Sequence, residues 1–290
     1  MTALEFDLRL VGRTTRVRIA GEGTPVILIH GGGLGSSGRV WLPVVPHLAA
    51  SHRIIVPDLI GFGDSSTPDV EDGLPLFIRQ ISELLDVLCL DRAVLVGHSM
   101  GCQIATVLAL RSPMRVQGLG LFACGGRFVG VSYESAGHAL LEEVIANPTE
   151  AAVRSLVECV NGVLDDVDAE VAERMRWARR SGHLAAQRNL AAARRQPGRG
   201  EVDYAGVDRL RMPIVLGWGD LERFNPVEIG PQIAGRLPRG SRYQVFRGAG
   251  HNIPHDRPAE AAQVIADLVR AAVDMPVEPD PGVIATTAAI

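Results

Sequence analysis

The chain has 290 residues, a length that fits one large α/β domain with an insertion as well as it fits two separate domains. Hydrophobic residues make up 47 % of it and charged residues 21 %, as in an ordinary globular protein, and the formal net charge is only −4. A net charge this small does not strongly attract phosphates or acidic membranes. We therefore expect neither nucleic acid nor a membrane as a partner.

The first predicted element is an antiparallel hairpin at the N-terminus. Apolar residues recur at every second position, at Phe6, Leu8 and Leu10 and again at Val17 and Ile19, on either side of the turn sequence "VGRTT". A period of two is typical of strands that bury one face.

Short aliphatic runs then alternate with helical stretches. The runs are "PVILIH", "RIIVPD", "AVLVG" and "GLGLFAC", and the stretches between them include "LFIRQISELLDVLCL" and "CQIATVLALRS". Strands that are apolar on both faces and alternate with helices imply a parallel sheet with right-handed crossovers. The pattern returns later in the chain with "MPIVLGWGD", "RYQVF" and a last helix, "PAEAAQVIADLVRAAV".

The sequence predicts a helical insertion between two strands of this sheet. No convincing strand lies between about Phe128 and Gly206, while apolar residues recur there at helical spacing: Val171, Met175, Ala178, Leu184, Leu190 and Ala193. We therefore expect residues 1–127 and 207–275 to form the core and residues 128–206 the insertion. Residues 276–290 follow a proline break and have no periodic face, which predicts a flexible tail.

The four cysteines are widely spaced and form no CxxC pair, which predicts buried free thiols in a reducing compartment. The N-terminal stretch lacks the continuous apolar core of a signal peptide, and no later segment reaches ~18 uninterrupted apolar residues. We therefore expect a cytoplasmic protein, and we leave open whether it is a homo-oligomer.

Ser99 stands at a tight corner between a strand and a helix, in Gly97-His98-Ser99-Met100-Gly101. The two glycines are needed because a Cβ would clash where the chain reverses. Such a nucleophile elbow lifts the serine hydroxyl above the sheet edge and leaves the Met100 amide at the helix N-terminus, free to donate to a developing oxyanion. Five residues also match by chance, but the strand before them and the helix after them are what the mechanism requires.

A serine hydroxyl is a poor nucleophile until a base takes its proton. Of the eight histidines, His251 is the predicted base because it lies on a small-residue loop between the last strand and the last helix. His255 is the nearest alternative; no carboxylate or cysteine cluster accompanies the pair, so we expect no metal site. We expect His98 to pack or hydrogen-bond locally and His30 to order its loop.

An acid must hold the histidine in the correct tautomer. Asp220 is the predicted acid, because it ends a buried strand and precedes the strand that leads to His251, with Glu222 two residues away as the alternative. The glycines of "HGGGLGSSG", residues 30–38, let the backbone approach a reacting carbonyl, and the loop supplies the second half of an oxyanion hole beside Met100. We expect a structural role for "PDLIGFGDSS", residues 57–66.

The order of the motifs along residues 4–272 resembles that of the α/β-hydrolase superfamily. The motifs are HGGG after one strand, D-x-x-G-x-G-x-S after the next, GHSMG at the corner, a late GD and a final GH. The resemblance implies an α/β fold with an eight-stranded, mostly parallel sheet and a helical cap inserted after the sixth strand. It implies Ser99 as nucleophile, His251 as base and Asp220 as acid, with the Gly32 and Met100 amides as oxyanion donors and no cofactor.

Within the superfamily the loops look like those of the meta-cleavage product hydrolases, which cut carbon–carbon bonds in vinylogous 1,5-diketones. Leu34 and Asn252 stand where that branch usually has proline and tryptophan. Its cap also carries an arginine for the substrate carboxylate, and five arginines compete for that role here: Arg174, Arg176, Arg179, Arg180 and Arg188.

We therefore expect a serine-dependent hydrolase of a small to medium carboxylic ester or lactone. Carbon–carbon hydrolysis is the alternative, because the same triad serves both reactions. A lyase, a cyclase or a ligand-binding protein on the same fold is the third hypothesis.

Overall fold

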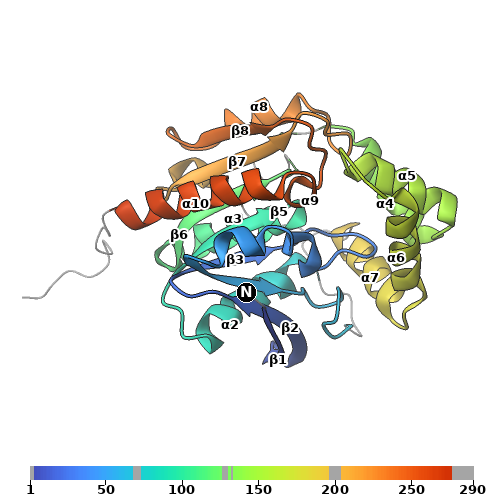
Figure 1. Ribbon diagram of the computed structural model, residues 1–290, viewed down its shortest axis with the longest axis horizontal. Helices are drawn as coiled ribbons and strands as arrows, with labels where there is room; N and C mark the ends of the chain where they lie inside the picture. The colour runs from blue at the N-terminus through green and yellow to red at the C-terminus, as the bar shows by residue number, and fades with distance from the viewer. Residues whose placement is uncertain (1–2, 68–72, 126–129, 132, 196–203, 276–290) are drawn as a thin grey trace, which may run out of the picture.

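The computed structural model describes residues 3–67, 73–125, 130–131, 133–195 and 204–275. Its centre is one eight-stranded sheet with the strand order β1-β2-β4-β3-β5-β6-β7-β8 (Figure 1). The strands are β1 (Leu4–Leu10), β2 (Arg13–Ala20), β3 (Thr24–Ile29), β4 (His52–Pro57), β5 (Ala93–His98), β6 (Val116–Phe122), β7 (Ile214–Gly219) and β8 (Arg242–Phe246).

The pairing of the strands matches the predicted fold class. β1 and β2 form the expected antiparallel hairpin, and β2 also runs antiparallel to β4. From β4 to β8 every neighbouring pair is parallel. The α/β fold with an eight-stranded, mostly parallel sheet is therefore confirmed.

Helices follow most of the strands. They are α1 (Val45–Leu48), α2 (Leu74–Val87), α3 (Met100–Arg111), α4 (Ala136–Ala146), α5 (Glu150–Val160), α6 (Val167–Arg179), α7 (His183–Arg195), α8 (Ile229–Ala234), α9 (Ile253–Asp256) and α10 (Pro258–Asp274), with short 3-10 turns η1 (Gly38–Trp41), η2 (Pro113–Arg115) and η4 (Val207–Arg209).

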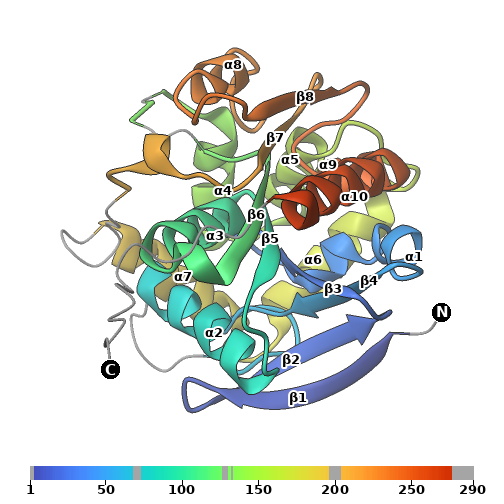
Figure 2. The same ribbon diagram turned by 90° about the vertical axis from the view of Figure 1, so that its left-hand side faces the viewer.

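Two hydrophobic cores lie on the two faces of the sheet. Successive residues of a strand point to opposite faces, so Ile27 and Ile29 of β3 pack with α2 and α3, whereas Val26 and Leu28 pack with α1 and α10. Figure 2 shows these helix pairs on opposite sides of the strands. All four side chains are fully buried, which contributes about 1.5–3 kcal/mol each and explains why the strands read as continuous apolar runs.

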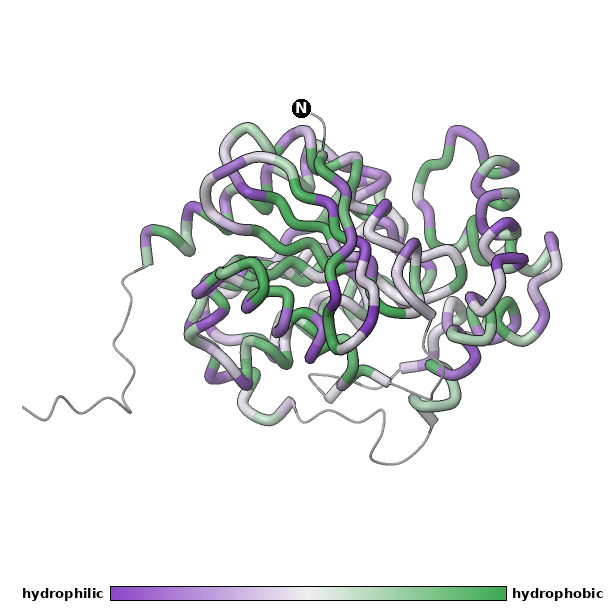
Figure 3. The backbone as a smooth tube through the Cα atoms, turned by 90° about the horizontal axis from the view of Figure 1, so that it is seen from below, coloured by the Kyte–Doolittle hydropathy of each residue, from purple (hydrophilic) through white to green (hydrophobic). Residues whose placement is uncertain are grey.

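Four helices, α4 to α7, lie between β6 and β7 in the chain and are called the cap helices here. They form a group at one end of the sheet, on the right in Figure 1. Along them hydrophobic and hydrophilic residues alternate, whereas the strands of the main body are hydrophobic stretches (Figure 3). The expected boundaries at 128 and 206 stay predictions, and residues 126–129 and 196–203 lie outside the described residues, as does the predicted tail, 276–290.

The cap helices have a hydrophobic core of their own that includes two residues from the main body. Leu34 comes from the glycine-rich loop after β3 and Phe224 from the loop after β7, and both are buried among α4, α5 and α6. Of the apolar residues expected at helical spacing, Val171 lies in this core and Met175, Ala178 and Leu184 pack against it, whereas Leu190 belongs to the core on the α2 and α3 face of the sheet. The cap helices therefore pack directly on the loops at the carboxyl ends of β3 and β7.

Candidate active site

Ser99 occupies the strained corner that the sequence predicts. It lies between β5 and α3 with φ 52° and ψ −116°, a backbone conformation that residues other than glycine rarely adopt. A Cβ at Gly97 would lie 2.3 Å from Cys102 N, and one at Gly101 would lie 2.3 Å from Ile29 O, so both positions require glycine. Ser99 is half-buried, whereas its neighbours His98 and Met100 are buried, so Ser99 keeps some exposed surface at this corner.

His251 lies in the loop between β8 and α9 and is 4 % exposed. Its Nδ1 is 2.9 Å from Glu222 Oε2. The Phe224 ring stacks on the imidazole with the ring centroids 4.4 Å apart, and the His98 ring lies 5.1 Å away. The imidazole is thus held by a carboxylate at one nitrogen and enclosed by two other rings.

Glu222 is buried and uses both carboxylate oxygens. Oε2 faces His251, while Oε1 accepts the backbone N–H groups of Phe224 at 2.8 Å and Asn225 at 3.0 Å. A buried carboxylate is tolerated only when its oxygens are hydrogen-bonded. The two amides orient the side chain so that Oε2 is directed at the imidazole.

The expected pairing of Asp220 with His251 does not agree with the structure. Asp220 is the first residue after β7; it is exposed, and its Oδ1 accepts the backbone N–H of Gly248 at 2.6 Å. The loop after β7 turns so that the side chain two residues later, Glu222, points inward. The alternative acid considered from the sequence is therefore the one that meets the histidine.

His255, the alternative base, lies beside a different acid. Its Nδ1 is 3.5 Å from Asp256 Oδ1, and its side chain is 47 % exposed. The hydrogen bond to Asp256 raises the pKa of His255 above its usual value. His255 thus lies beside Asp256, at a distance that allows an ion pair when the ring is protonated.

The loop of residues 30–38 lies against the elbow: a Cβ at Gly31 would be 3.0 Å from Ser99 Cβ. His30 orders this loop, as expected. Its Nε2 accepts the Leu59 N–H at 2.9 Å, and its Nδ1 is 2.7 Å from Gly31 O. Burial lowers the pKa of His30 to about 4, so the neutral ring donates through Nδ1–H to that carbonyl.

This hydrogen bond sets the direction of the Gly32 amide. The Gly31 carbonyl and the Gly32 N–H belong to one planar peptide and point in opposite directions, so a carbonyl held by His30 leaves the N–H facing away from that ring. Ser36 Oγ donates to Gly32 O at 2.7 Å and orders the next peptide. Met100 is the first residue of α3, where backbone N–H groups have no acceptor within the helix.

Asp58, in the 57–66 turn, has the structural role expected for that turn. Its buried carboxylate accepts from Arg18 at 3.0 Å, from Gly38 N at 2.8 Å and from Asp64 N at 2.9 Å. It therefore connects β2 to the end of the 30–38 loop.

Four of the five cap arginines considered as substrate anchors bind protein groups. Arg174 bonds to Leu34 O and Glu170, and Arg188 bonds to the carbonyls of Ile145 and Ala146. Arg176 pairs with Glu173, Arg180 pairs with Asp64, and Arg179 is exposed.

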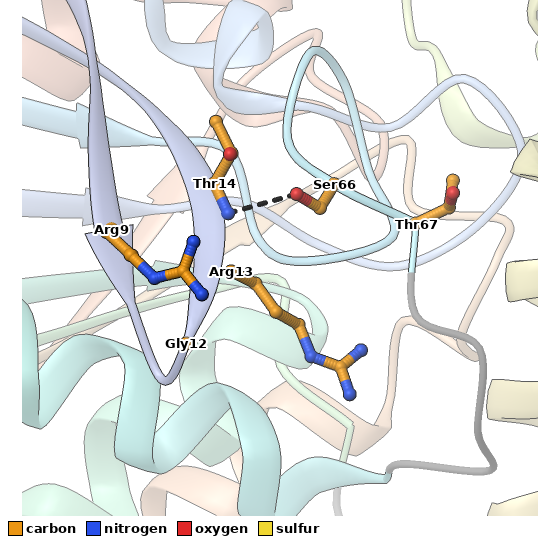
Figure 4. A pocket seen from close by; sticks show the side chains of 6 residues that line it. All are labelled: Arg9, Gly12, Arg13, Thr14, Ser66 and Thr67. Carbon is orange, nitrogen blue, oxygen red and sulfur yellow. Dashed lines mark hydrogen bonds between the residues drawn. The ribbon is translucent and has the colours of Figure 1, made fainter.

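A separate hollow of about 380 Å³ lies at the turn between β1 and β2 (Figure 4). Thr14 N donates to Ser66 Oγ at 3.0 Å in its wall. Its lining does not include Ser99 or His251; it consists of Arg9, Gly12, Arg13, Thr14, Ser66 and Thr67.

Within the described residues, no group of three or more histidine, cysteine or acidic side chains is arranged to hold a metal ion. Over the same ranges, no helix has both the length and the apolar character needed to cross a bilayer.

The family model described as "Alpha/beta hydrolase family" matches residues 26–264 of this chain. The chain belongs to the α/β hydrolase family. The resemblance found in the motifs is thereby confirmed, and this family member is an enzyme of the hydrolase class.

The similar proteins and solved structures described next are also named as hydrolases. A 2-hydroxymuconate semialdehyde hydrolase from Pseudomonas sp. (strain CF600) is 30 % identical over 275 residues, covering 91 % of this chain and 93 % of the relative. A 2-hydroxy-6-oxo-6-phenylhexa-2,4-dienoate hydrolase from Burkholderia cepacia is 30 % identical over 80 % of this chain and 82 % of its own.

Among solved structures, the 2-hydroxy-6-oxo-6-phenylhexa-2,4-dienoate hydrolase from Rhodococcus sp. strain RHA1 superposes with a TM-score of 0.84 at 21 % identity, over 92 % of this chain and 99 % of that one. The carboxylesterase CesB from Bacillus subtilis gives 0.76 at 19 % identity, over 93 % and 92 %. At these identities the likeness concerns the fold alone.

Proposed function

We propose that this α/β hydrolase cleaves small to medium carboxylic esters or lactones by acyl transfer to water. The observation that carries the proposal is the buried pair of Glu222 and His251, 2.9 Å apart, in a fold whose nucleophile elbow presents Ser99. A histidine held by a carboxylate is the base that a serine nucleophile needs.

In the proposed reaction, His251 Nε2 takes the proton of Ser99 Oγ as the oxygen attacks the substrate carbonyl. Glu222 holds Nδ1–H and stabilises the imidazolium, and the Gly32 and Met100 amides donate to the oxyanion. The leaving group departs with the proton from His251. Water then repeats the cycle on the acyl-enzyme, so that the acid is released and Ser99 is regenerated.

The cap arginines favour a substrate without a carboxylate. Arg174 and Arg188 bond to backbone carbonyls of the protein, and Arg176 and Arg180 pair with acidic side chains. A carboxylate on the substrate would have to displace one of these partners or bind Arg179, which is exposed to solvent. This supports a neutral ester or lactone.

Carbon–carbon hydrolysis of a vinylogous diketone is the second candidate, and the names of the two 30 % identical relatives support it. The two reactions use one triad, so the substrate separates them. We would assay short p-nitrophenyl esters and 2-hydroxy-6-oxohexa-2,4-dienoates in parallel. Faster turnover of the esters is the expected result, and a wide preference for the dienoates would replace the first candidate by the second.

Ser99→Ala tests the nucleophile in both reactions. We expect it to lower turnover by about 10⁶-fold and to abolish labelling by a fluorophosphonate. Ser155→Ala is the matched control, because Ser155 is exposed on α5 and its hydroxyl bonds only to Ala151 O in the described structure. Full hydrolysis by Ser99→Ala would refute the mechanism, and tight ligand binding by a wild-type protein that the fluorophosphonate does not label would favour a binding protein.

A further inference from the structure

The loop that carries His251 is held on three sides. Toward the elbow, His98 Nε2 donates to His251 O at 2.9 Å. Toward the cap helices, Asn252 N donates to Val160 O at the end of α5, at 2.8 Å. Toward α9, Gly250 N donates to Asp256 Oδ2 at 2.7 Å. The residue before the base and the residue after it are therefore both fixed.

Asp256 also binds the cap segment. The same oxygen that accepts from Gly250 accepts the Gly162 N–H at 2.8 Å. The Asp256 side chain has no exposed surface. A Cβ at Gly162 would lie 2.5 Å from Gly250 N, so the two backbones meet with no room for a side chain between them.

A second set of bonds joins the same segments. Asn252 Nδ2 donates to Asn161 Oδ1 at 2.8 Å, and Arg223 donates to Asn161 O at 2.9 Å. Arg223 directly follows Glu222 in the chain. The residues at the end of α5 thus contact both the loop that bears the base and the loop that bears the acid.

We propose that Asp256 and Asn252 are positioning residues that couple the cap helices to His251. The inference rests on the proposed function, in which His251 is the base for Ser99. Neither side chain is placed to react; each ties the main chain beside the imidazole to the end of α5. A displacement of the base by 1 Å costs about 10²-fold in rate, so contacts between substrate and cap helices affect turnover through these bonds.

The position of the cap helices makes such contacts expected. A Cβ at Gly33 would lie 3.0 Å from Leu141 Cδ1 of α4, so the cap covers the loop that carries Gly32. We therefore expect a long acyl chain at Ser99 to reach the cap helices and an acetyl group to be too short to do so. In the wild-type enzyme, kcat should rise with acyl length.

The experiment measures kcat and KM for p-nitrophenyl acetate and p-nitrophenyl octanoate. Asp256→Ala should lower kcat for the octanoate by about 10²-fold and for the acetate much less, with little change in KM. Asp256→Asn should recover most of the loss, because its amide oxygen can still accept both backbone N–H groups. Asp274→Ala, which removes an exposed acid at the end of α10, should leave both constants unchanged.

Asn252→Ala keeps the test decisive if Asp256→Ala does not fold. It removes only the side-chain bond to Asn161 and should also lower kcat selectively for the octanoate. Equal losses for both esters, or no loss, would overturn the coupling. Ser99→Ala separates a failure of the coupling from a failure of the proposed function. If Ser99→Ala is inactive, Ser99 is still the nucleophile of the proposed mechanism, and only the coupling between the cap helices and His251 is refuted.

Discussion

Replacing Glu222 by glutamine should inactivate the enzyme almost completely while leaving its fold intact. The new amide has one oxygen, and two backbone donors, Phe224 N and Asn225 N, already require an oxygen at the Oε1 position. The NH₂ group must therefore face His251 Nδ1. Because NH₂ is a donor, Nδ1 has to become an acceptor, and the ring proton moves to Nε2.

A histidine with its proton on Nε2 cannot take the proton of Ser99. In serine proteases, the corresponding acid-to-amide change lowers kcat by about 10⁴ through this same change of tautomer. A loss of that size is about 5 kcal/mol of transition-state stabilisation. We expect it here in kcat for a p-nitrophenyl ester and in the rate of fluorophosphonate labelling, with KM nearly unchanged.

Asp220→Asn is the matched control, two residues away in the same loop. Its carbonyl oxygen can still accept the Gly248 N–H, and the side chain is exposed, so activity should match the wild type. If Asp220→Asn lost activity by orders of magnitude while Glu222→Gln kept it, the assignment of the acid from the structure would be wrong.

Two further predictions concern stability. Burial is the largest cause that lowers the pKa of His30 to about 4 and that of His98 to about 3, from 6.5, so the unfolded chain binds protons first as the pH falls. The free energy of unfolding in urea should be at its full value above pH 6.5 and fall by up to about 2.7 kcal/mol per pH unit toward pH 4 for the two rings; a flat profile there would contradict their burial as neutral groups. Gly101→Ala places a Cβ against Ile29 O and should lower the free energy of unfolding, measured by thermal unfolding, by about 1–3 kcal/mol or more and abolish fluorophosphonate labelling. Gly235→Ala is the control and should be tolerated, because the nearest atom to its new Cβ lies at 3.6 Å. Equal stability of both variants would argue against the tight elbow.

Much of the fold could be predicted because it depends on neighbouring residues. Runs such as "AVLVG" are apolar on both faces because each strand lies between two layers of helices. The corner at Ser99 is visible in the sequence because the two glycines that relieve its clashes lie within two positions of it. The position of His251 follows in the same way, from a small-residue loop between a strand and a helix.

The carboxylate that pairs with His251 could not be chosen from the sequence. Asp220 and Glu222 share one turn, and the side chain that faces inward depends on how that turn meets the loops at Gly248 and His251. Nor could spacing reveal that Asp256 binds the cap segment, because its partner Gly162 lies 94 positions away. Phe224, which stacks on His251, carried no signal apart from being an aromatic residue two positions after Glu222.

The sequence by itself determined the order of strands and helices, the strained serine corner and the loop that bears the histidine. These features follow from backbone sterics and from hydrophobic periodicity, which act over a few residues. Only the tertiary structure decided which carboxylate pairs with His251, which cap arginines bind the protein itself and how the cap is attached to the loop that carries His251. Those outcomes depend on hydrogen bonds between segments far apart in the chain, whose geometry exists only once the sheet and the cap have packed together.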